Sequence, residues 1–371
     1  MKKRSSSRQN PKRATKAKGA QRSVTIGMDL GDRNSRYCIL SSEGEILREG
    51  QVATTKAEMI KTFSRLGRAR IAIEVGTHSP WVTRLLQSFG HEVIVANPRQ
   101  VKLITESSRK DDRLDAQTLA RLARIDPQLL RPIRHRSEKA QTALMVIRVR
   151  AALIAVRTSL VNTARGLAKA MGERLPKCDA DQMGVLQAES VPAKLRQLLE
   201  PLLKEVESLT EKIKDSDREI EQIAREDYPE TALLEQVGGV GPLIALTFVL
   251  TVDDKNRFQR SRDLGCYVGL RPRRSDSGQR QPQLRITKEG DPYLRTMLVQ
   301  GAHYILSRRG PDTDLKRWGL RLAERGGKRA KKKAVVGVAR KLSILLHRLW
   351  VTGEVYEPLR NPRDQRKKSA A

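Results

Sequence analysis

Apolar residues between positions 24 and 96 come in short runs that are rich in β-branched side chains and are separated by polar or glycine-containing stretches. Such runs are typical of β-strands. The first three follow one another at hairpin-like spacing, whereas each of the last two is preceded by a helix-like stretch. Three strands followed by alternating helices and strands predict an α/β domain with a sheet of mixed direction. The five predicted strands are 24–30, 36–42, 45–53, 70–75 and 92–96.

A different pattern begins near residue 138, where apolar residues recur at alternating three- and four-residue steps. One such seam runs from Leu144 to Ala168, and a second runs from Leu202 to Ile223 after a polar break at 172–192. The spacing predicts two long helices, which pair either as a hairpin within one chain or as a coiled coil between chains. We favour a pairing that holds subunits together, which makes the protein a homo-oligomer, a dimer or a tetramer.

The region from 229 to 357 is mainly helical in its pattern. Within it, LLEQVGGVGPLIALTFV places a glycine-rich turn between two helical runs, which is the shape of a helix-hairpin-helix-like element. The amides of such a turn can face a phosphate, although the same residues are also common in an ordinary tight turn. The apolar run at 242–252 is too short to cross a bilayer, and the basic N-terminus lacks an apolar signal core. We therefore expect no membrane contact and a cytoplasmic, nucleoid-associated protein.

Charge narrows the class of partner. The chain has 73 Lys and Arg residues against 42 Asp and Glu, which gives a formal net charge of +31. A polyanion is therefore the expected partner, DNA above all. Residues 1–22 carry nine basic residues and no acidic one, which predicts a disordered basic arm held near phosphates. The three cysteines are far apart and lack metal-ligand spacing, which fits a reducing compartment.

Against this basic background, four carboxylates stand out. Asp112 and Asp115 are three residues apart, so they project from one face of a helix, while Asp29 ends the first predicted strand and Glu74 ends the fourth. If these strands are neighbours, as in ribonuclease H-like sheets, a helix docked across the sheet edge brings all four carboxylates together. Such a group repels itself unless cations lie between its members, and oxygen-only ligands suit Mg²⁺. Two such ions can polarise a scissile phosphate. The simpler alternative is that the helix aspartates only cap a helix N-terminus.

Four segments together make the sequence resemble a known family. They are IGMDLGDRNS, AIEVGTHSPW, RKDDRLDAQTLARLAR and the block GLRPRRSDSGQR with ITKEGDPYLR, in this order. This combination resembles the DEDD-type insertion-sequence transposases over nearly all of 24–357. The resemblance implies that Asp29, Glu74, Asp112 and Asp115 form a catalytic, Mg²⁺-binding tetrad, with Asp111 left out as a helix-start residue. It also implies a fold of class α/β plus α. The corresponding parts are a basic disordered arm (1–22), a RuvC-like domain with a mixed, ribonuclease H-like sheet (23–135), a helical coiled-coil region (136–228), a mainly helical C-terminal transposase domain (229–357) and a basic tail (358–371).

The resemblance further implies a catalytic serine in the Ser-Gly step of the C-terminal block, which is Ser277 here. A serine hydroxyl needs activation, and in the family this is thought to come from the tetrad and its Mg²⁺ in a composite site. Ser275 is the second choice because it does not directly precede the glycine. Serine in a sequence such as SDSG also often serves only the turn. The basic residues that could neutralise a phosphate near Ser277 are Arg271, Arg273, Arg274, Arg280, Arg285 and Lys288.

These observations predict a recombinase that cuts and rejoins DNA through a serine–DNA covalent intermediate. Similar enzymes take their target sequence from a noncoding bridge RNA, and this partner is implied by the resemblance alone. A hydrolytic RuvC-like nuclease is the first alternative, and it would form no covalent adduct. A non-catalytic nucleic-acid-binding protein is the second, and it would keep its activity without the carboxylates.

Overall fold

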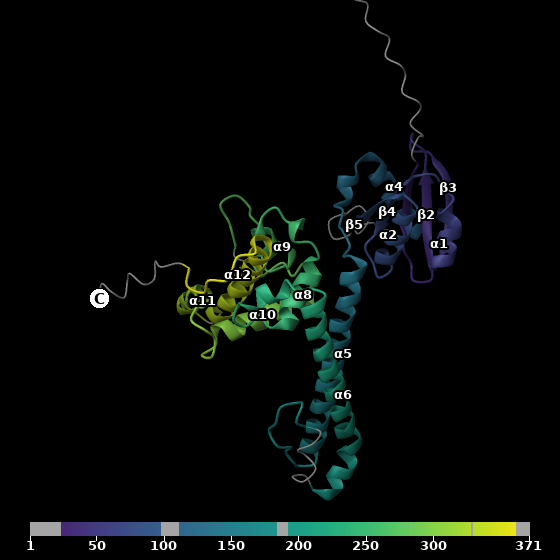
Figure 1. The fold of residues 1–371 in the computed structure, drawn as a ribbon. Helices are drawn as coiled ribbons and strands as arrows, with labels where there is room; N and C mark the ends of the chain where they lie inside the picture. Colours follow the sequence, from purple (N-terminus) through teal and green to yellow (C-terminus); the bar gives the residue numbers. More distant parts are fainter. Residues whose placement is uncertain (1–23, 98–110, 184–191, 283, 328, 361–371) are drawn as a thin grey trace, which may run out of the picture. The chain divides into compact units, whose positions relative to one another are not determined.

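The computed structural model describes residues 24–97, 111–183 and 192–360, apart from positions 283 and 328. Two compact units divide the chain between His135 and Arg136 (Figure 1). The predicted basic arm and most of the predicted basic tail lie outside the described residues.

A five-stranded sheet of mixed direction forms the centre of the first unit, as the sequence predicts. Its strand order is β3-β2-β1-β4-β5, in which β1, β4 and β5 run parallel and β2 runs antiparallel to both β1 and β3. This arrangement is ribonuclease H-like. The strands are β1 (Thr25–Asp29), β2 (Asn34–Leu40), β3 (Ile46–Ala53), β4 (Arg70–Glu74) and β5 (Glu92–Ala96).

Helices cover both faces of this sheet because strand side chains alternate between the faces. On one face, Met28 and its neighbours pack against α1 (Lys56–Phe63) and α2 (Ser79–Ser88). The other face is covered by α4 (Asp112–Ile125), whose fully buried Leu119 packs on β4 and β5. The one-turn helix η2 (Pro127–Leu130) follows α4. The face under α4 is the face that Asp29 and Glu74 share.

Glycine at position 27 sets how closely α4 approaches β1. A Cβ atom at Gly27 would lie 2.0 Å from the carbonyl oxygen of Ala116 and 2.4 Å from the amide nitrogen of Ala120. The helix therefore contacts the strand backbone directly, with two alanines facing the glycine. Any side chain at position 27 would push α4 away from the sheet.

Two long helices, α5 (Glu138–Ala170) and α6 (Ala193–Glu226), form an antiparallel hairpin in the second unit (Figure 1). The start of α5 packs against the end of α6, with Leu144 and Ile220 in one cluster. The end of α5 packs against the start of α6 around Val161. The predicted seams thus meet within one chain, which decides between the two pairings that the sequence left open for them.

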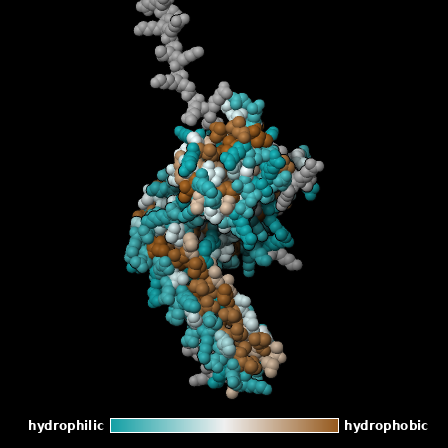
Figure 2. All heavy atoms as spheres, turned by 90° about the vertical axis from the view of Figure 1, so that its right-hand side faces the viewer, coloured by the Kyte–Doolittle hydropathy of each residue, from teal (hydrophilic) through white to brown (hydrophobic). Residues whose placement is uncertain are grey.

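A second row of apolar side chains remains exposed on α5. Figure 2 shows it as a continuous stripe along the helical hairpin. Met145, Val149 and Val156 are 60%, 55% and 50% exposed, and Leu167 and Met171 extend the row toward the end of the helix. We call these five residues the apolar stripe.

The rest of the second unit is a helical domain around a single core. Phe248, Leu298 and Leu342 are fully buried in it. The apolar run predicted not to cross a membrane is α8, which is surrounded by other helices, and no described helix is long and apolar enough to span a bilayer. The elements are α7 (Thr231–Glu235), α8 (Pro242–Val252), η3 (Lys255–Arg257), η4 (Ser261–Asp263), α9 (Leu264–Tyr267), α10 (Pro292–Leu306), α11 (Asp314–Glu324) and α12 (Ala330–Thr352).

The glycine-rich turn predicted as helix-hairpin-helix-like joins α7 to α8. A Cβ atom at Gly239 would lie 3.1 Å from the carbonyl oxygen of Gly301 on α10, and one at Gly238 would lie 2.5 Å from the ring of Pro311. These two glycines therefore serve close packing within the domain. A phosphate contact through the turn stays a prediction.

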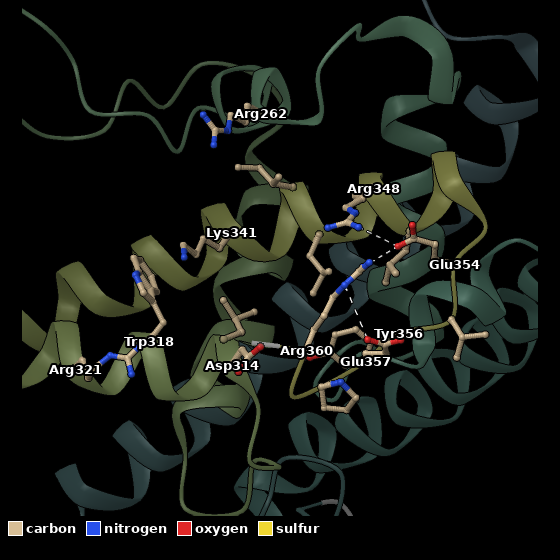
Figure 3. A pocket seen from close by; sticks show the side chains of 16 residues that line it. Arg262, Asp314, Trp318, Arg321, Lys341, Arg348, Glu354, Tyr356, Glu357 and Arg360 are labelled. Atoms are coloured by element: carbon tan, nitrogen blue, oxygen red, sulfur yellow. Dashed lines mark hydrogen bonds and ion pairs between the residues drawn. The ribbon is translucent and has the colours of Figure 1, made fainter. Parts of the chain in front are cut away.

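A pocket opens between α11 and α12 and is closed on one side by residues 354–360 (Figure 3). Its volume is about 560 Å³. The pocket shares no residue with the predicted serine segment.

Candidate active site

Asp29 and Glu74 lie at matching ends of two neighbouring parallel strands. Met28 pairs with Ile73 in the β1–β4 register, so the next residue on each strand occupies the same sheet edge. Both carboxylates share the sheet face of Gly27 and Ala72, which is the face under α4. The expectation that these two strands are neighbours is confirmed.

Asp112 and Asp115 occupy the first turn of α4. Asp111 is the N-cap of this helix, because its side chain accepts a hydrogen bond of 3.0 Å from the amide of Arg113. Its prediction as a helix-start residue is confirmed. Close docking of α4 at Gly27 then holds the first turn of the helix near the ends of β1 and β4.

The charges of these four residues act on one another. Burial, together with the nearby negative charges of Asp112, Asp115 and Glu74, raises the pKa of Asp29 from 3.8 to about 6. Burial also raises the pKa of Glu74, with a contribution from Asp115. We call these four residues the acidic cluster. The structure brings its members into one electrostatic environment, and their catalytic role stays a prediction.

The acidic cluster has the chemistry of a divalent-cation site, since it offers carboxylate oxygens whose negative charges repel one another. Burial first, and then this repulsion, raise the pKa of Asp29. In the described parts of the chain, however, no three acidic, His or Cys side chains are arranged as a closed group of metal ligands. The residues present therefore fit such an ion by their chemistry, and their side chains do not define its position.

A clamp from β3 holds the start of α4, and sequence reasoning missed it. Glu49 accepts a hydrogen bond of 2.7 Å from Arg113 Nε and another of 2.5 Å from Gln117 Nε2. These bonds hold the pKa of Glu49 below its usual value. Because Glu49 is 64 residues from Arg113 in the sequence, local spacing gave no sign of this contact.

His78 is a second residue that sequence reasoning missed, although it lies in a motif that carried the resemblance. It lies in the loop after β4, where Trp81 Nε1 donates a hydrogen bond of 3.1 Å to its Nδ1. Its Nε2 therefore bears the proton in the neutral ring and lies 3.5 Å from Asp32 Oδ1. Asp32 is in the loop after β1, so the contact ties together the two loops that follow Asp29 and Glu74.

Ser277 lies in the second unit, in the tight turn of an irregular hairpin. Its backbone exchanges hydrogen bonds of 3.1 and 3.0 Å with Arg280, and Gly278 has a φ of +55° between them. Ser275 and Ser277 are both exposed, and no described residue hydrogen-bonds to the Ser277 hydroxyl. The turn is thus closed by backbone groups, and Ser277 is exposed to solvent.

The basic residues predicted around Ser277 line both arms of this hairpin. Arg273 N–H donates to Arg285 O at 2.9 Å, and Thr287 N–H donates to Arg271 O at 2.8 Å, which brings the two arms together. We call residues 271–288 the serine loop. All six predicted phosphate-binding residues of the loop are exposed: Arg271, Arg273, Arg274, Arg280, Arg285 and Lys288.

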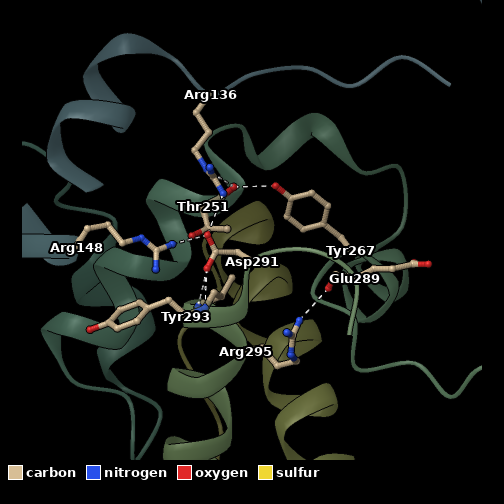
Figure 4. Close-up of polar contacts among 9 residues, drawn as sticks. Arg136, Arg148, Thr251, Tyr267, Glu289, Asp291, Tyr293 and Arg295 are labelled. Atoms are coloured by element: carbon tan, nitrogen blue, oxygen red, sulfur yellow. Dashed lines mark hydrogen bonds and ion pairs between the residues drawn. The ribbon is translucent and has the colours of Figure 1, made fainter. Parts of the chain in front are cut away.

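Asp291 anchors the serine loop at its base (Figure 4). It caps α10 by accepting hydrogen bonds from the amides of Tyr293 and Leu294 at 2.9 and 3.0 Å. It also accepts a hydrogen bond of 2.6 Å from Arg148 on α5, and Arg136 approaches it to 3.4 Å.

This network stabilises the charge of Asp291. Although burial alone would raise its pKa, the hydrogen bonds and the two arginines hold the pKa of Asp291 below its usual value. The network thus connects the loop to the helical hairpin through residues 143 positions apart. Sequence spacing gave no sign of it.

Comparison with known proteins finds similarity to transposases in both halves of the chain. Residues 26–171 match a family model of DEDD transposases of the IS110 group, and residues 231–316 match the model of the IS116/IS110/IS902 transposase family. The transposase for insertion sequence element IS1111A of Coxiella burnetii is 28% identical to this chain, over 89% of the chain and 90% of its own length.

Two further relatives are similar over most of their length. The putative transposase y4pF/y4sB of Sinorhizobium fredii is 30% identical over 90% of this chain and 85% of its own length. The transposase for insertion sequence element IS1328 of Yersinia enterocolitica is 26% identical over 76% of this chain and 84% of its own length.

Proposed function

This chain belongs to the IS116/IS110/IS902 family of insertion-sequence transposases, enzymes that cleave and join DNA, and from that membership we propose that Ser277 is the nucleophile. Its Oγ attacks a DNA phosphodiester, so that an oxygen–phosphorus bond to the serine forms while the bond from phosphorus to one deoxyribose oxygen breaks. The released strand end leaves as a hydroxyl. Because one ester replaces another, a strand hydroxyl can later attack the serine linkage and rejoin the DNA without an external energy source.

The observation that carries this proposal is the serine loop itself. It presents an exposed hydroxyl, without a hydrogen bond to the described residues, at the turn of a hairpin with arginines on both arms. Arginine side chains neutralise a phosphate and the charge that develops on it during attack. A serine that served only the turn would need none of this surrounding charge.

We assign activation of the nucleophile and stabilisation of the transition state to the acidic cluster. The family implies use of a divalent metal ion, and oxygen-only ligands favour Mg²⁺. Asp29, Glu74, Asp112 and Asp115 are the residues that would hold it. When bound, such an ion polarises a scissile phosphate and stabilises the oxygens on either side of it.

The test of the serine mechanism compares two serines of the same loop. Ser277→Ala removes the hydroxyl and leaves the charge of the loop intact, so we expect DNA binding within about 2-fold of wild type and loss of strand cleavage by about 10³-fold or more. Ser275→Ala is the matched control and should retain most of the activity. In interrupted wild-type reactions, digestion and mass spectrometry should find a nucleotide attached to the peptide that contains Ser277.

The same experiment separates the proposal from its rivals. A hydrolytic nuclease would release free strand ends without an adduct and would be insensitive to Ser277→Ala. An adduct on Ser275 would support the covalent mechanism and show that Ser275, not Ser277, is the nucleophile. Wild-type cleavage by the Ser277→Ala protein would end the assignment.

We further propose that a noncoding RNA guides target choice and that the enzyme acts at the nucleoid as a dimer or tetramer. The net charge of +31 permits binding of RNA as well as DNA. The apolar stripe on α5 supports self-association, because a row of large apolar side chains on a basic protein is costly to leave in water. Sequencing of RNA that co-purifies with the protein tests the guide: one discrete species is expected, and a random mixture would contradict it.

A further inference from the structure

The pocket between α11 and α12 has an apolar floor and a charged rim (Figure 3). Leu315 and Leu345 belong to the floor, and Tyr356 and Trp318 add aromatic surface. At about 560 Å³ the pocket falls within the roughly 300–1,000 Å³ that sites for small organic groups occupy. Five cationic residues and three acidic ones line it, so its local charge is positive: Arg262, Arg321, Lys341, Arg348 and Arg360 against Asp314, Glu354 and Glu357.

Glu354 pairs with two of the cations that line the pocket. Glu354 accepts hydrogen bonds from Arg348 at 3.0 Å and from Arg360 at 2.9 Å, so two of the cations are satisfied on one side of the pocket. On the other side, Lys341 Nζ lies 4.0 Å from the centre of the Trp318 ring, and no carboxylate in the described chain pairs with it.

Another cation acts on the charge of Lys341. Burial and then the positive charge of Arg321 lower the pKa of Lys341. Figure 3 shows Trp318 and Arg321 on α11 opposite Lys341 on α12. This corner of the pocket therefore holds the Lys341 ammonium against an aromatic ring with the Arg321 guanidinium nearby, and a phosphate placed there would contact positive charge.

We propose that this pocket binds one unpaired nucleotide of a single-stranded segment, with its phosphate at Lys341 and Arg321 and its base and sugar on the apolar floor. A duplex phosphate would use the cations and leave the floor empty, because paired bases stay stacked inside the helix. An unpaired base can leave the strand and bury its faces on apolar and aromatic side chains. The inference deepens the proposed function, on which it rests, since strand exchange and an RNA guide both expose unpaired nucleotides.

The test measures binding by the full-length protein. Lys341→Gln removes the charge and keeps a polar side chain in the pocket, and Lys332→Gln makes the same change on α12 outside the pocket. Fluorescence anisotropy would follow a labelled 20-nucleotide single strand, as DNA and as RNA, and the fully paired DNA duplex. We expect Lys341→Gln to weaken single-strand binding by about 5- to 10-fold. The slope of the logarithm of the binding constant against the logarithm of the salt concentration should become shallower by about 0.7. Duplex binding should stay within about 2-fold of wild type, as should all binding by Lys332→Gln.

Several results would overturn the proposal. Equal losses of single-strand affinity for Lys341→Gln and Lys332→Gln would show that both lysines contribute only non-specific attraction to nucleic acid. An equal loss of duplex affinity would show that Lys341 contacts only the phosphate backbone. Displacement of the strand from this site by a polyglutamate peptide as readily as by unlabelled oligonucleotide would mark an acidic-peptide site instead. Comparison of the DNA and RNA arms tells which strand supplies the nucleotide.

A second measurement needs no variant. Oligonucleotides that carry 4-thiothymidine or 4-thiouridine should photocrosslink to wild-type peptides from α11, α12 or 354–360, and crosslinks confined to the serine loop would contradict the pocket. These readouts do not depend on chemistry. If Ser277→Ala still cleaves DNA, the serine mechanism fails, and the comparison of Lys341→Gln with Lys332→Gln still tests the pocket. If Lys341→Gln binds single strands as wild type does, the pocket proposal fails, and the Ser277→Ala experiment still tests the serine mechanism.

Discussion

Asp29 keeps its negative charge with difficulty, since it is half-buried and three other carboxylates act on it. The sequence singled out this residue and three others because Asp29 and Glu74 end predicted strands and Asp112 and Asp115 share one face of a predicted helix, and their catalytic role stays a prediction. The sequence was not sufficient to identify what holds them in place. Glu49, His78 and Asp32 act through contacts between segments far apart in the chain, and no local pattern predicts such contacts.

The raised pKa of Asp29 predicts how the metal-free protein responds to pH. A carboxyl group whose pKa rises from 3.8 to about 6 on folding favours the folded state fully below pH 4, and this contribution is lost as the pH rises through 6. A rise of this size corresponds to roughly 3 kcal/mol, and partial solvent screening reduces it to about 1–2 kcal/mol.

Asp29→Asn should therefore raise the melting temperature in EDTA by a few degrees at pH 7.5 and by less at pH 5. Added Mg²⁺ should stabilise the wild type more than the variant at pH 7.5. Thermal denaturation followed by a dye or by circular dichroism measures both effects. A variant that melts below wild type at both pH values would contradict the charge repulsion.

Asp112 and Asp111 give the sharpest test of which helix residues are catalytic. Asp112→Asn should abolish strand exchange and leave DNA binding nearly intact, as should Asp29→Asn, Glu74→Gln and Asp115→Asn. Asp111→Asn is the adjacent control, and it should be mild because asparagine caps a helix N-terminus about as well as aspartate. Strand-exchange assays with plasmid substrates compare the two. Equal severity of Asp111→Asn and Asp112→Asn would show that the assignment is off by one residue.

At the scale of elements, the strands could be predicted well and their assembly only in part. The predicted runs at 24–30, 70–75 and 92–96 contain β1, β4 and β5, because alternation and turn residues are local signals. The apolar seams of α5 and α6 were also predicted from the sequence, although the sequence did not decide whether they pair within one chain or between chains. The close packing of α4 on β1 depends on contacts of Gly27 with Ala116 and Ala120, which are 89 residues or more away in the sequence. Local sequence spacing does not predict such contacts.

Gly27→Ala tests whether that contact positions the acidic cluster. The added Cβ would lie 2.0 Å from a backbone oxygen, so α4 must shift outward and carry Asp112 and Asp115 with it. We expect a loss of stability of about 1–3 kcal/mol and a fall in strand exchange of about 100-fold.

Gly166→Ala is the matched control for this change. A Cβ atom at this α5 residue would meet nothing within 4 Å, so the variant should be equally active and up to about 1 kcal/mol more stable. Melting curves and the strand-exchange assay measure both variants. Wild-type activity and stability of Gly27→Ala would show that α4 does not depend on the close contact.

At the scale of the whole molecule, the buried seams change where self-association is expected. Leu209 and Ile213 are only 7% and 4% exposed, because they pack between α5 and α6 of their own chain. Charged substitutions there would unfold the hairpin and would say little about assembly. The apolar stripe lies outside this seam, runs about 39 Å from Met145 to Met171, and presents the kind of surface that a second helix covers.

Val149→Glu combined with Val156→Glu places two charges in the centre of the stripe. If a second copy of the chain covers the stripe, both carboxylates lose water on assembly, so the double variant should shift from oligomer to monomer and lose strand exchange. Asn162→Glu is the control, since it adds a charge on a different, exposed face of the same helix and should keep the wild-type assembly. Size-exclusion chromatography with light scattering measures the mass of each protein at the concentration of the activity assay. Because both valines are already exposed, the hairpin should melt at nearly the wild-type temperature, which separates lost assembly from lost folding. A wild-type protein that is monomeric and fully active at that concentration would remove the stripe as an assembly surface.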